Sequence, residues 1–179
     1  DRSVEENRQA AMHFGEIFLR MRRLPKPVVA VVHGRVLAGG CGLATACDLV
    51  LAAQSAQFGY PEIQRGFVPA IVMTLLRRAV GEKVAFDLAA SGRVLRALEA
   101  LGVGLVSRVA PDAELDTQAS ALLDALAGAS ATALALTKQQ FYQLDGQSFE
   151  AGIHLGADVN AVSRGTPDFR QAIAAFLKK

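Results

Sequence analysis

A short β-branched run that leads directly into a glycine-rich segment constrains the fold of this chain most. The run VVAVV occupies residues 28–32, and the segment HGRVLAGGCGLATACD follows at residues 33–48. An unbroken apolar run of this length is typical of a strand that is buried on both faces. The small residues of CGLATACD favour a helix after the glycines. The order of strand, glycine loop and helix predicts an α/β fold with backbone N–H groups available where the helix begins.

Hydrophobic periodicity predicts the elements on either side of this segment. Ser3 and Glu6 form a capping box that opens an amphipathic helix over residues 3–23. The run LVLAA at 49–53 is a second buried strand, and the glycines and prolines between 57 and 70 indicate an irregular loop. We expect further helices at 71–80 and 83–91, and short strands at 93–95 and 105–109.

From Asp112 onward, alanine and leucine dominate and the β-branched runs stop. This pattern predicts helices at 113–127, 131–144, 148–164 and 168–178. We therefore divide the chain into residues 1–111, which form part of an α/β core, and residues 112–179, a helical region that packs between subunits. Because Asp1 is not an initiating methionine, we expect that an upstream part of the core is not covered.

Composition and spacing argue against several classes of function. The net charge is only +2, and the basic cluster at 20–26 has no interleaved aromatic residues, so we expect no nucleic-acid partner. Cys41 and Cys47 are six residues apart, which fits neither a disulfide framework nor a metal site, and we interpret both as small buried residues. We find neither an apolar run of membrane-spanning length nor a signal peptide, and we expect a cytoplasmic or organelle-matrix protein. The three histidines lack the partners of a hydrolase triad.

The glycine segment itself allows three interpretations. It could hold a phosphate, but it lacks both GxxxxGK[ST] and GxGxxG. It could form an oxyanion hole, in which N–H groups stabilise negative charge that develops on a carbonyl oxygen. The glycines could also simply allow a helix to pack tightly on a strand.

Several separate motifs resemble the enoyl-CoA hydratase/isomerase family, also called the crotonase superfamily. These motifs are KPVVAVVHG, AGGCGLATACD, AQFGYPEI, LAASGRVL and GLVSRV, and the resemblance runs from about Lys26 to the C-terminus. It implies a spiral of ββα units, with a helical C-terminal region that builds homotrimers, often paired into hexamers. It also implies an acyl-CoA thioester as substrate and no cofactor besides the coenzyme A of that substrate.

The resemblance also implies roles for the glycines. In this family two backbone N–H groups hold the thioester oxygen and stabilise an enolate. Gly39 matches the residue that gives one of these donors, and Gly40 is its neighbour. The other donor comes from an upstream loop that this sequence does not contain.

Hydratases of the family typically use two glutamates, and this chain matches only one of them. Gly42 stands in the first place, and Glu62 stands in the second. A single carboxylate suits a shuttle that removes a proton from C2 and returns it at C4, which moves a double bond. Some hydratases of the family also resemble this pattern, so the choice between hydration and isomerisation stays open.

Other residues are candidates for binding the substrate. We expect Glu62 to lie in an apolar pocket near Phe67 and Val68, with Tyr60 and Phe67 lining the acyl site beside Gly40 and Gly42. Lys179 resembles a C-terminal lysine of the family that meets the phosphates of coenzyme A, although a frayed terminus would explain it equally well.

Two alternatives remain, and the missing glutamate permits the first of them. The chain could be a catalytically weak paralogue that binds acyl-CoA or serves as an oligomeric scaffold. It could also catalyse another reaction of the superfamily, such as thioester hydrolysis or decarboxylation.

Overall fold

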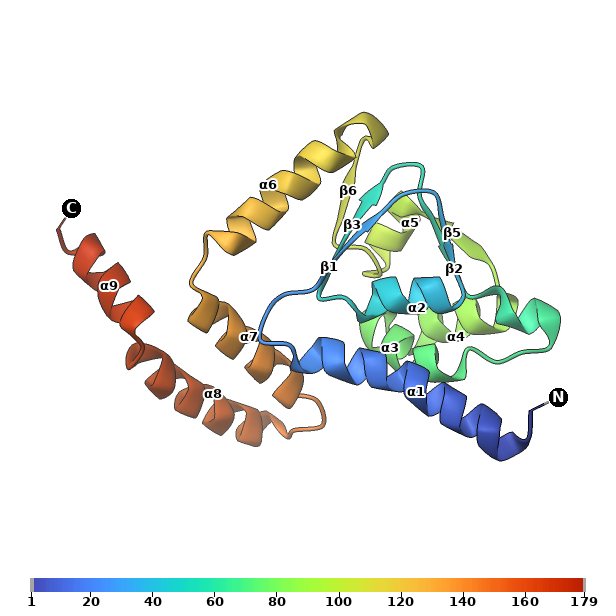
Figure 1. The fold of residues 1–179 in the computed structure, drawn as a ribbon, viewed down its shortest axis with the longest axis horizontal. Coiled ribbons are helices and arrows are strands. Elements are labelled where there is room, and N and C mark those ends of the chain that lie inside the picture. The colour runs from blue at the N-terminus through green and yellow to red at the C-terminus, as the bar shows by residue number, and fades with distance from the viewer. Residues whose placement is uncertain (1, 179) are drawn as a thin grey trace. The chain divides into compact units, whose positions relative to one another are not determined.

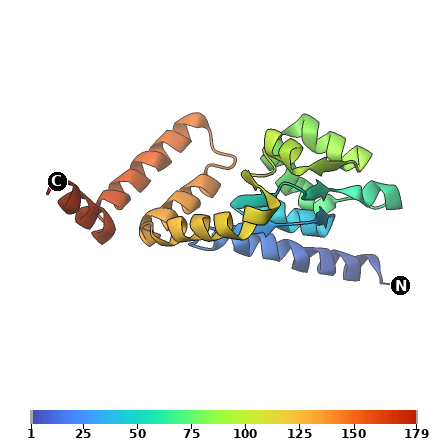
Figure 2. The same ribbon diagram turned by 90° about the horizontal axis from the view of Figure 1, so that it is seen from above.

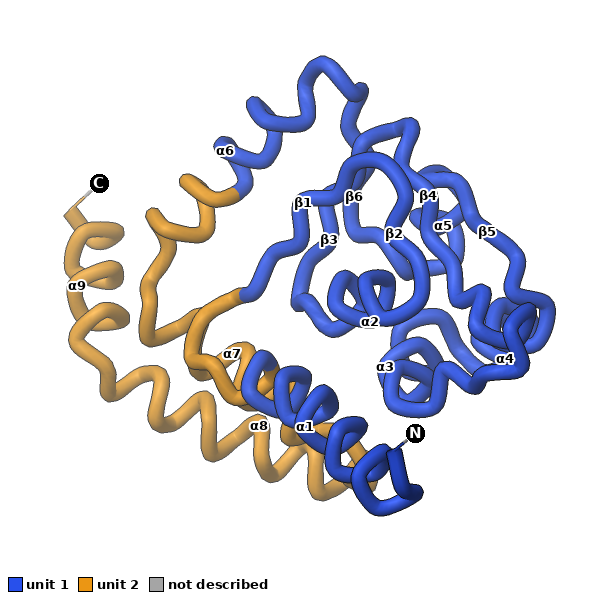
Figure 3. The backbone as a smooth tube through the Cα atoms, turned by 45° about the vertical axis from the view of Figure 1, so that its right-hand side comes forward, with its two compact units in different colours: residues 1–21, 28–122 blue, residues 22–27, 123–179 orange. Residues whose placement is uncertain are grey.

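The computed structural model describes residues 2–178, and the chain forms two compact units. The first comprises the residues up to Met21 together with Val28–Leu122, and the second comprises Arg22–Pro27 and the residues from Leu123 onward (Figure 3). The predicted boundary at residue 112 differs from this division. Helix α6 (Leu115–Ala127) buries Leu115 and Leu122, so its first part belongs to the first unit.

The first unit repeats a pattern of two strands and a helix (Figure 1). Strands β1 (Val29–Val32) and β2 (Arg35–Leu37) lead into α2 (Gly39–Ala46). Strands β3 (Leu49–Ala53) and β4 (Gln57–Gly59) lead, through the 3₁₀ helix η1 (Pro61–Arg65), into α3 (Ala70–Val80). The first strands of the two repeats pair in parallel, as do the second strands. Each repeat therefore adds one strand to each of two sheets, which confirms the predicted α/β architecture of ββα units.

The chain completes both sheets after a pair of helices. Helix α4 (Glu82–Ser91) precedes β5 (Val94–Arg96), which pairs antiparallel with β4. Helix α5 (Ala97–Gly102) precedes β6 (Arg108–Ala110), which pairs parallel with β3. The resulting orders are β1-β3-β6 and β2-β4-β5. The largest fully buried side chains of the described residues are Tyr60, Phe58, Leu51, Leu76, Leu88, Leu95 and Cys41, which all belong to this unit.

Helix α1 (Val4–Arg23) begins with the predicted capping box. The Glu6 N–H donates to Ser3 Oγ at 3.2 Å, and the Ser3 N–H donates to Glu6 Oε2 at 2.7 Å. The hydrogen bonds that the Ser3 N–H and then the Ser3 hydroxyl donate to the carboxylate lower the pKa of Glu6. The reciprocal bonds satisfy two backbone donors that a helix start leaves open, so this prediction is confirmed.

The second unit consists largely of helices. A short 3₁₀ helix η2 (Asp112–Glu114) and α6 lead into α7 (Ala131–Gln143), α8 (Phe149–Arg164) and α9 (Pro167–Phe176), which follow one another without an intervening strand (Figures 1 and 2). The side chains of Ser130, Ser148 and Thr166 cap these last three helices. Within the described residues, no single helix is long and apolar enough to cross a membrane. The segments Asp112–Ala127 and Ala131–Gln143 pass that test only together, and they are bent by 98°.

Some local predictions were wrong. Residues 57–70 were expected to form an irregular loop, yet they contain β4 and η1, and β2 was not expected at all. Strand β1 is not buried on both faces: it lies at the edge of its sheet, and Val31 is 39% exposed. Strand β6 begins three residues later than predicted because 103–107 form a turn and a connection. Cys47 is only partly buried.

Candidate active site

A cavity of about 960 Å³ opens in the first unit beside the start of α2. One face of α1 contributes Asn7, Ala11 and Phe14, which the helical repeat places on one side. The opposite wall runs from η1 through the following loop into the first turn of α3. The remaining lining residues are Ala38, Gly39, Pro61, Glu62, Arg65, Gly66, Phe67, Val68, Pro69, Ala70, Ile71 and Val72.

The 3₁₀ helix η1 fixes the backbone of Glu62 at this cavity. Pro61 starts the helix with a preset φ, and Gly66 ends it in the left-handed region at φ 66°. The Phe67 N–H donates to the carbonyl oxygen of Glu62 at 3.1 Å. Gln64 Nε2 donates to the carbonyl of Gly92 at 3.2 Å, which ties η1 to the end of α4. Glu62 is therefore held on a short, anchored element.

The carboxylate of Glu62 carries an unsatisfied oxygen. Among the described residues, its Oε2 is the one buried side-chain oxygen or nitrogen without a hydrogen-bond partner. A buried acceptor that lacks a partner costs about 1–3 kcal/mol, so native structures rarely keep one without a use for it. Glu62 itself lines the cavity, so its carboxyl group remains the candidate acid or base of the site.

The start of α2 brings one free backbone N–H group to the lining of the same cavity. Ala38, the residue before the helix, has a φ of 53°, and its N–H donates to the carbonyl of Gly59 at 2.9 Å. No side chain caps the helix, and the N–H of Gly39 has no hydrogen-bond partner among residues 2–178. Gly39 lines the cavity, whereas Gly40 is exposed outside the lining. A free N–H at a helix start favours a developing negative charge.

Gly42 lies below the cavity floor instead of lining it. It is buried in α2, and a Cβ built on it would lie 2.1 Å from Cγ1 of Val72 and 3.8 Å from Cζ of Phe18. Val72 itself lines the cavity. The space that a side chain at position 42 would need is therefore filled by an aliphatic group from α3.

Tyr60 does not line the cavity, so the expectation that it contacts the acyl group needs correction. The residue is fully buried, and its hydroxyl lies 2.6 Å from Thr45 Oγ1. Burial raises the pKa of the neighbouring Cys41 thiol to about 11, and burial likewise raises the pKa of Tyr60. The charge of Glu62 adds a smaller raising effect on both pKa values. Tyr60 thus belongs to the core behind Glu62.

The loop after η1 places two residues at the cavity that Glu62 lines. Phe67 and Val68 line the cavity, and they are 67% and 54% exposed. Asn7 and Arg65 also line the cavity and were not predicted from the sequence. For Arg65 the reason is that an irregular loop over 57–70 gives its side chain no defined direction. Lys179 lies outside the described residues. Within those residues, no group of three or more histidine, cysteine or carboxylate side chains could hold a metal ion.

Comparisons with known proteins agree on one family. The family model described as "Enoyl-CoA hydratase/isomerase" matches residues 2–179. The chain is 44% identical over 176 residues to a "Putative enoyl-CoA hydratase" of Thermus thermophilus, a match that covers 98% of this chain and 70% of that protein. It is 36% identical over 166 residues to a "Probable enoyl-CoA hydratase" of Bacillus subtilis, with coverage of 92% and 64%.

Solved structures give the same result for the fold. The crystal structure of an enoyl-CoA hydratase from Mycobacterium smegmatis aligns with a TM-score of 0.96 at 30% identity, covering 99% of this chain and 69% of that one. The structure of an enoyl-CoA hydratase/isomerase from Cupriavidus metallidurans CH34 aligns with a TM-score of 0.93 at 32% identity, covering 99% and 68%. The chain thus spans about two thirds of these proteins, and 58% of a relative from Dictyostelium discoideum that is 35% identical over 160 residues, or 89% of this chain.

Proposed function

Because the chain belongs to the enoyl-CoA hydratase/isomerase family, we propose that it acts on an acyl-CoA thioester through an enolate, with Glu62 as its single acid/base. The unpartnered, buried Oε2 of Glu62 carries this proposal, since Glu62 lines the same cavity as Gly39, whose N–H is free. The carboxylate supplies a proton acceptor, and the N–H supplies a donor for a thioester oxygen. The reaction calls for no cofactor besides the coenzyme A of the substrate.

Double-bond isomerisation is the reaction that this site supports best. Glu62 removes a proton from C2 of a 3-enoyl thioester, and the electrons of that C–H bond form an enolate whose oxygen accepts a hydrogen bond from Gly39. The enolate then collapses while the protonated Glu62 returns the proton to C4, which leaves the double bond between C2 and C3. Proton and electrons balance with one carboxylate. Val72 fills the place of a second one at position 42.

Hydration of a 2-enoyl thioester is the second candidate. The relatives from Thermus thermophilus and Bacillus subtilis carry hydratase names, which favours this reaction. A single carboxylate would then both activate the water that attacks C3 and deliver the proton to C2. The two reactions differ in their substrate, so an assay can separate them.

The test is an absorbance assay with crotonyl-CoA and a 3-enoyl-CoA in parallel. Isomerisation of the 3-enoyl substrate raises the absorbance of the conjugated thioester, and hydration of crotonyl-CoA lowers it. We expect Glu62→Gln to reduce kcat at least about a hundredfold for whichever reaction occurs, because general acid/base catalysis contributes on that order.

The matched control is Glu150→Gln, which makes the same change at an 87% exposed side chain of α8, outside the cavity. It is expected to leave turnover unchanged. Full activity of Glu62→Gln would show that the proposed role of Glu62 is wrong. Binding of both thioesters without turnover would support a scaffold or a weak paralogue instead.

A further inference from the structure

The cavity that Glu62 lines is also lined by one positively charged side chain. Arg65 lines it, and Glu62 and Arg65 are the two ionisable side chains among the described lining residues. The guanidinium of Arg65 has neither an ion pair nor a hydrogen bond within residues 2–178. Elsewhere in the first unit, Arg77 pairs with Glu82, and Arg93 pairs with Asp87 and Glu99. A guanidinium stays charged at any working pH, so Arg65 offers a permanent anion site at the cavity.

The 3₁₀ helix sets the spacing between this cation and the carboxylate. In such a helix residues i and i+3 eclipse one another, and each residue advances by about 2 Å, so Arg65 follows Glu62 on the same face at an axial distance of about 6 Å. Pro61, Gly66 and the Gln64–Gly92 hydrogen bond hold this element in place. The acid/base and the cation are thus presented side by side to one ligand.

The remaining wall beyond Arg65 is apolar. Phe67, Val68, Ile71 and Val72 continue it towards α3. An acyl chain that lies along this wall from Glu62 reaches Arg65 within a few carbon atoms. A hydrocarbon tail offers the exposed guanidinium no acceptor, whereas a carboxylate on the chain would accept its paired N–H donors.

We propose that Arg65 is a specificity-determining residue, which binds a carboxylate at the far end of a short acyl chain. The substrate class is then a short-chain dicarboxylic acyl thioester, since Glu62 and Arg65 are neighbours on one short helix. This inference rests on the proposed function, because it assumes that the thioester end lies at Glu62 and Gly39.

Binding of unreactive thioesters tests this specificity without relying on catalysis. Glutaryl-CoA and pentanoyl-CoA have acyl chains of equal carbon number, and only the first ends in a carboxylate. Isothermal titration calorimetry should show tighter binding of glutaryl-CoA by the unaltered chain. Arg65→Gln should weaken glutaryl-CoA binding at least tenfold and leave pentanoyl-CoA binding unchanged, and Arg65→Lys should restore part of the difference. Arg108→Gln is the matched control, because Arg108 is exposed on β6 and lies outside the cavity.

A phosphate of coenzyme A could also bind a guanidinium, and the same experiment separates the two anions. If Arg65→Gln weakened the binding of glutaryl-CoA and of pentanoyl-CoA equally, the carboxylate assignment would be overturned in favour of a phosphate contact. Glutaryl-pantetheine, which lacks the nucleotide phosphates, should remain sensitive to Arg65→Gln if the carboxylate is the ligand. If Arg65→Gln kept the same preference for glutaryl-CoA over pentanoyl-CoA, the proposed role of Arg65 would be wrong, while the proposed function would be unaffected. If the unaltered chain binds neither thioester, the proposed function fails as well.

Discussion

Gly42 and Val72 show how one residue pair decides what chemistry the cavity can hold. The family resemblance directs attention to position 42 as the place of a missing carboxylate. The structure adds that Val72 Cγ1 lies where a Cβ at position 42 would be placed. The lack of a side chain at position 42 and the presence of an aliphatic side chain from α3 are therefore complementary. A glutamate at position 42 would not fit without a change at position 72.

This complementarity predicts coupled stabilities. Gly42→Ala places its Cβ within 2.1 Å of Val72 and should lower the free energy of unfolding by about 1–3 kcal/mol, as overpacking does. In the double variant with Val72→Ala the clash is removed, so the two changes should cost less together than the sum of their single costs. Urea unfolding of all four chains measures the coupling, expected at about 0.5–3 kcal/mol.

Gly102→Ala is the control for this cycle. A Cβ at Gly102 meets no atom within 4 Å, and its φ lies outside the left-handed region, so the change should stay within about 0.5 kcal/mol of the parent chain. If Gly42→Ala matched that control, or if the cycle were additive, the packing argument would be refuted.

Cys41 makes the first unit sensitive to alkaline pH. Burial raises its pKa in the folded chain from 9.0 to about 11, so the fold prefers the neutral thiol. The stabilising contribution is therefore complete below pH 9 and is lost as the pH rises from about 9 towards 11. A shift of about two units corresponds to roughly 2–3 kcal/mol at its limit.

Thiolate absorbance measures this shift directly. In a Cys47→Ser chain, we expect Cys41 to ionise near pH 11 when folded and near pH 9 in denaturant. In a Cys41→Ala chain, the same absorbance reports the ionisation of the partly buried Cys47 for comparison. Ionisation of Cys41 at pH 9 in the folded chain would contradict the burial argument.

Sequence and structure agree on some residues of the site and differ on others for physical reasons. Glu62 and Gly39 were assigned from motifs, and the geometry places both at one cavity. Arg65 could not be assigned, because its direction depends on the 3₁₀ turn that residues 61–65 adopt. Tyr60 could not be separated from the acyl site by pattern, since it follows the strand β4, whose three residues are too few to show which side chains face the core.

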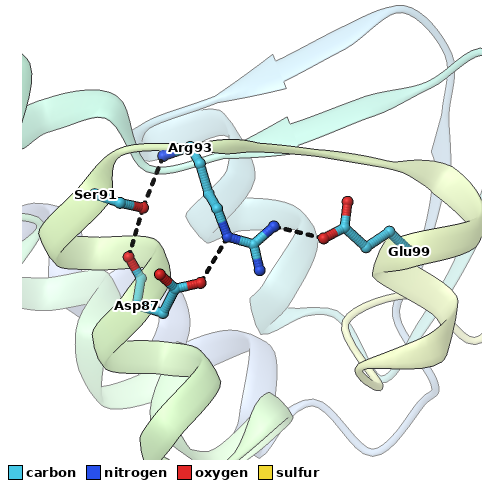
Figure 4. Close-up of polar contacts among 4 residues, drawn as sticks. All are labelled: Asp87, Ser91, Arg93 and Glu99. Carbon is cyan, nitrogen blue, oxygen red and sulfur yellow. Dashed lines mark hydrogen bonds and ion pairs between the residues drawn. The ribbon is translucent and has the colours of Figure 1, made fainter.

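At the scale of elements, a surface network joins helices α4 and α5 around β5 (Figure 4). Arg93 Nε donates to Asp87 Oδ2 at 2.6 Å, and Arg93 Nη1 donates to Glu99 Oε1. The Arg93 N–H also donates to Ser91 Oγ, whose hydroxyl donates to the carbonyl of Asp87. The hydrogen bond to Asp87 is the largest cause of the raised pKa of Arg93. One residue thus fixes the turn between α4 and β5 and contacts α5.

Removal of this side chain should have a modest effect. Arg93→Met is expected to lower the free energy of unfolding by about 1 kcal/mol, because these partners are 39–50% exposed and solvent weakens such pairs. The difference should shrink as salt concentration rises. Thermal unfolding at two ionic strengths measures both effects. Arg96→Met, an exposed change on the same strand, is the control, and equal losses in the two variants would show that the network adds nothing.

Elements differ in how far sequence predicts them. Helices α3, α4, α7 and α8 begin and end within about one residue of their predicted positions, because several turns of periodicity and clear caps define them. The strands β2 and β4 span three residues each, which is too short for an alternation of polar and apolar residues to be recognised. Their existence depends on pairing with each other and with β5, which is a tertiary effect.

At the scale of the whole molecule, burial is unevenly distributed between the two units. The buried apolar side chains of the described residues end at Leu122, and beyond it only Lys138 is buried, donating to the carbonyl of Lys26. Large apolar side chains of the second unit remain exposed, including Phe149 at 87%, Ile153 at 60% and Phe176 at 73%. Such side chains gain about 1.5–3 kcal/mol each when they are buried. They therefore favour contact with a further protein surface.

Self-association is the outcome we expect from this exposed apolar surface, and the family resemblance implies that the assembly is a homotrimer or a hexamer. Phe149 and Ile153 are four residues apart on α8 and share one face, so a charge between them should oppose assembly. Sedimentation equilibrium of the unaltered chain should give a trimer or a hexamer. Ile153→Asp should shift the population towards monomer at equal concentration. Asp158→Lys, about 140° around the same helix, is the control and should keep the assembly. A monomer in the unaltered chain, or identical assembly in Ile153→Asp, would contradict the argument.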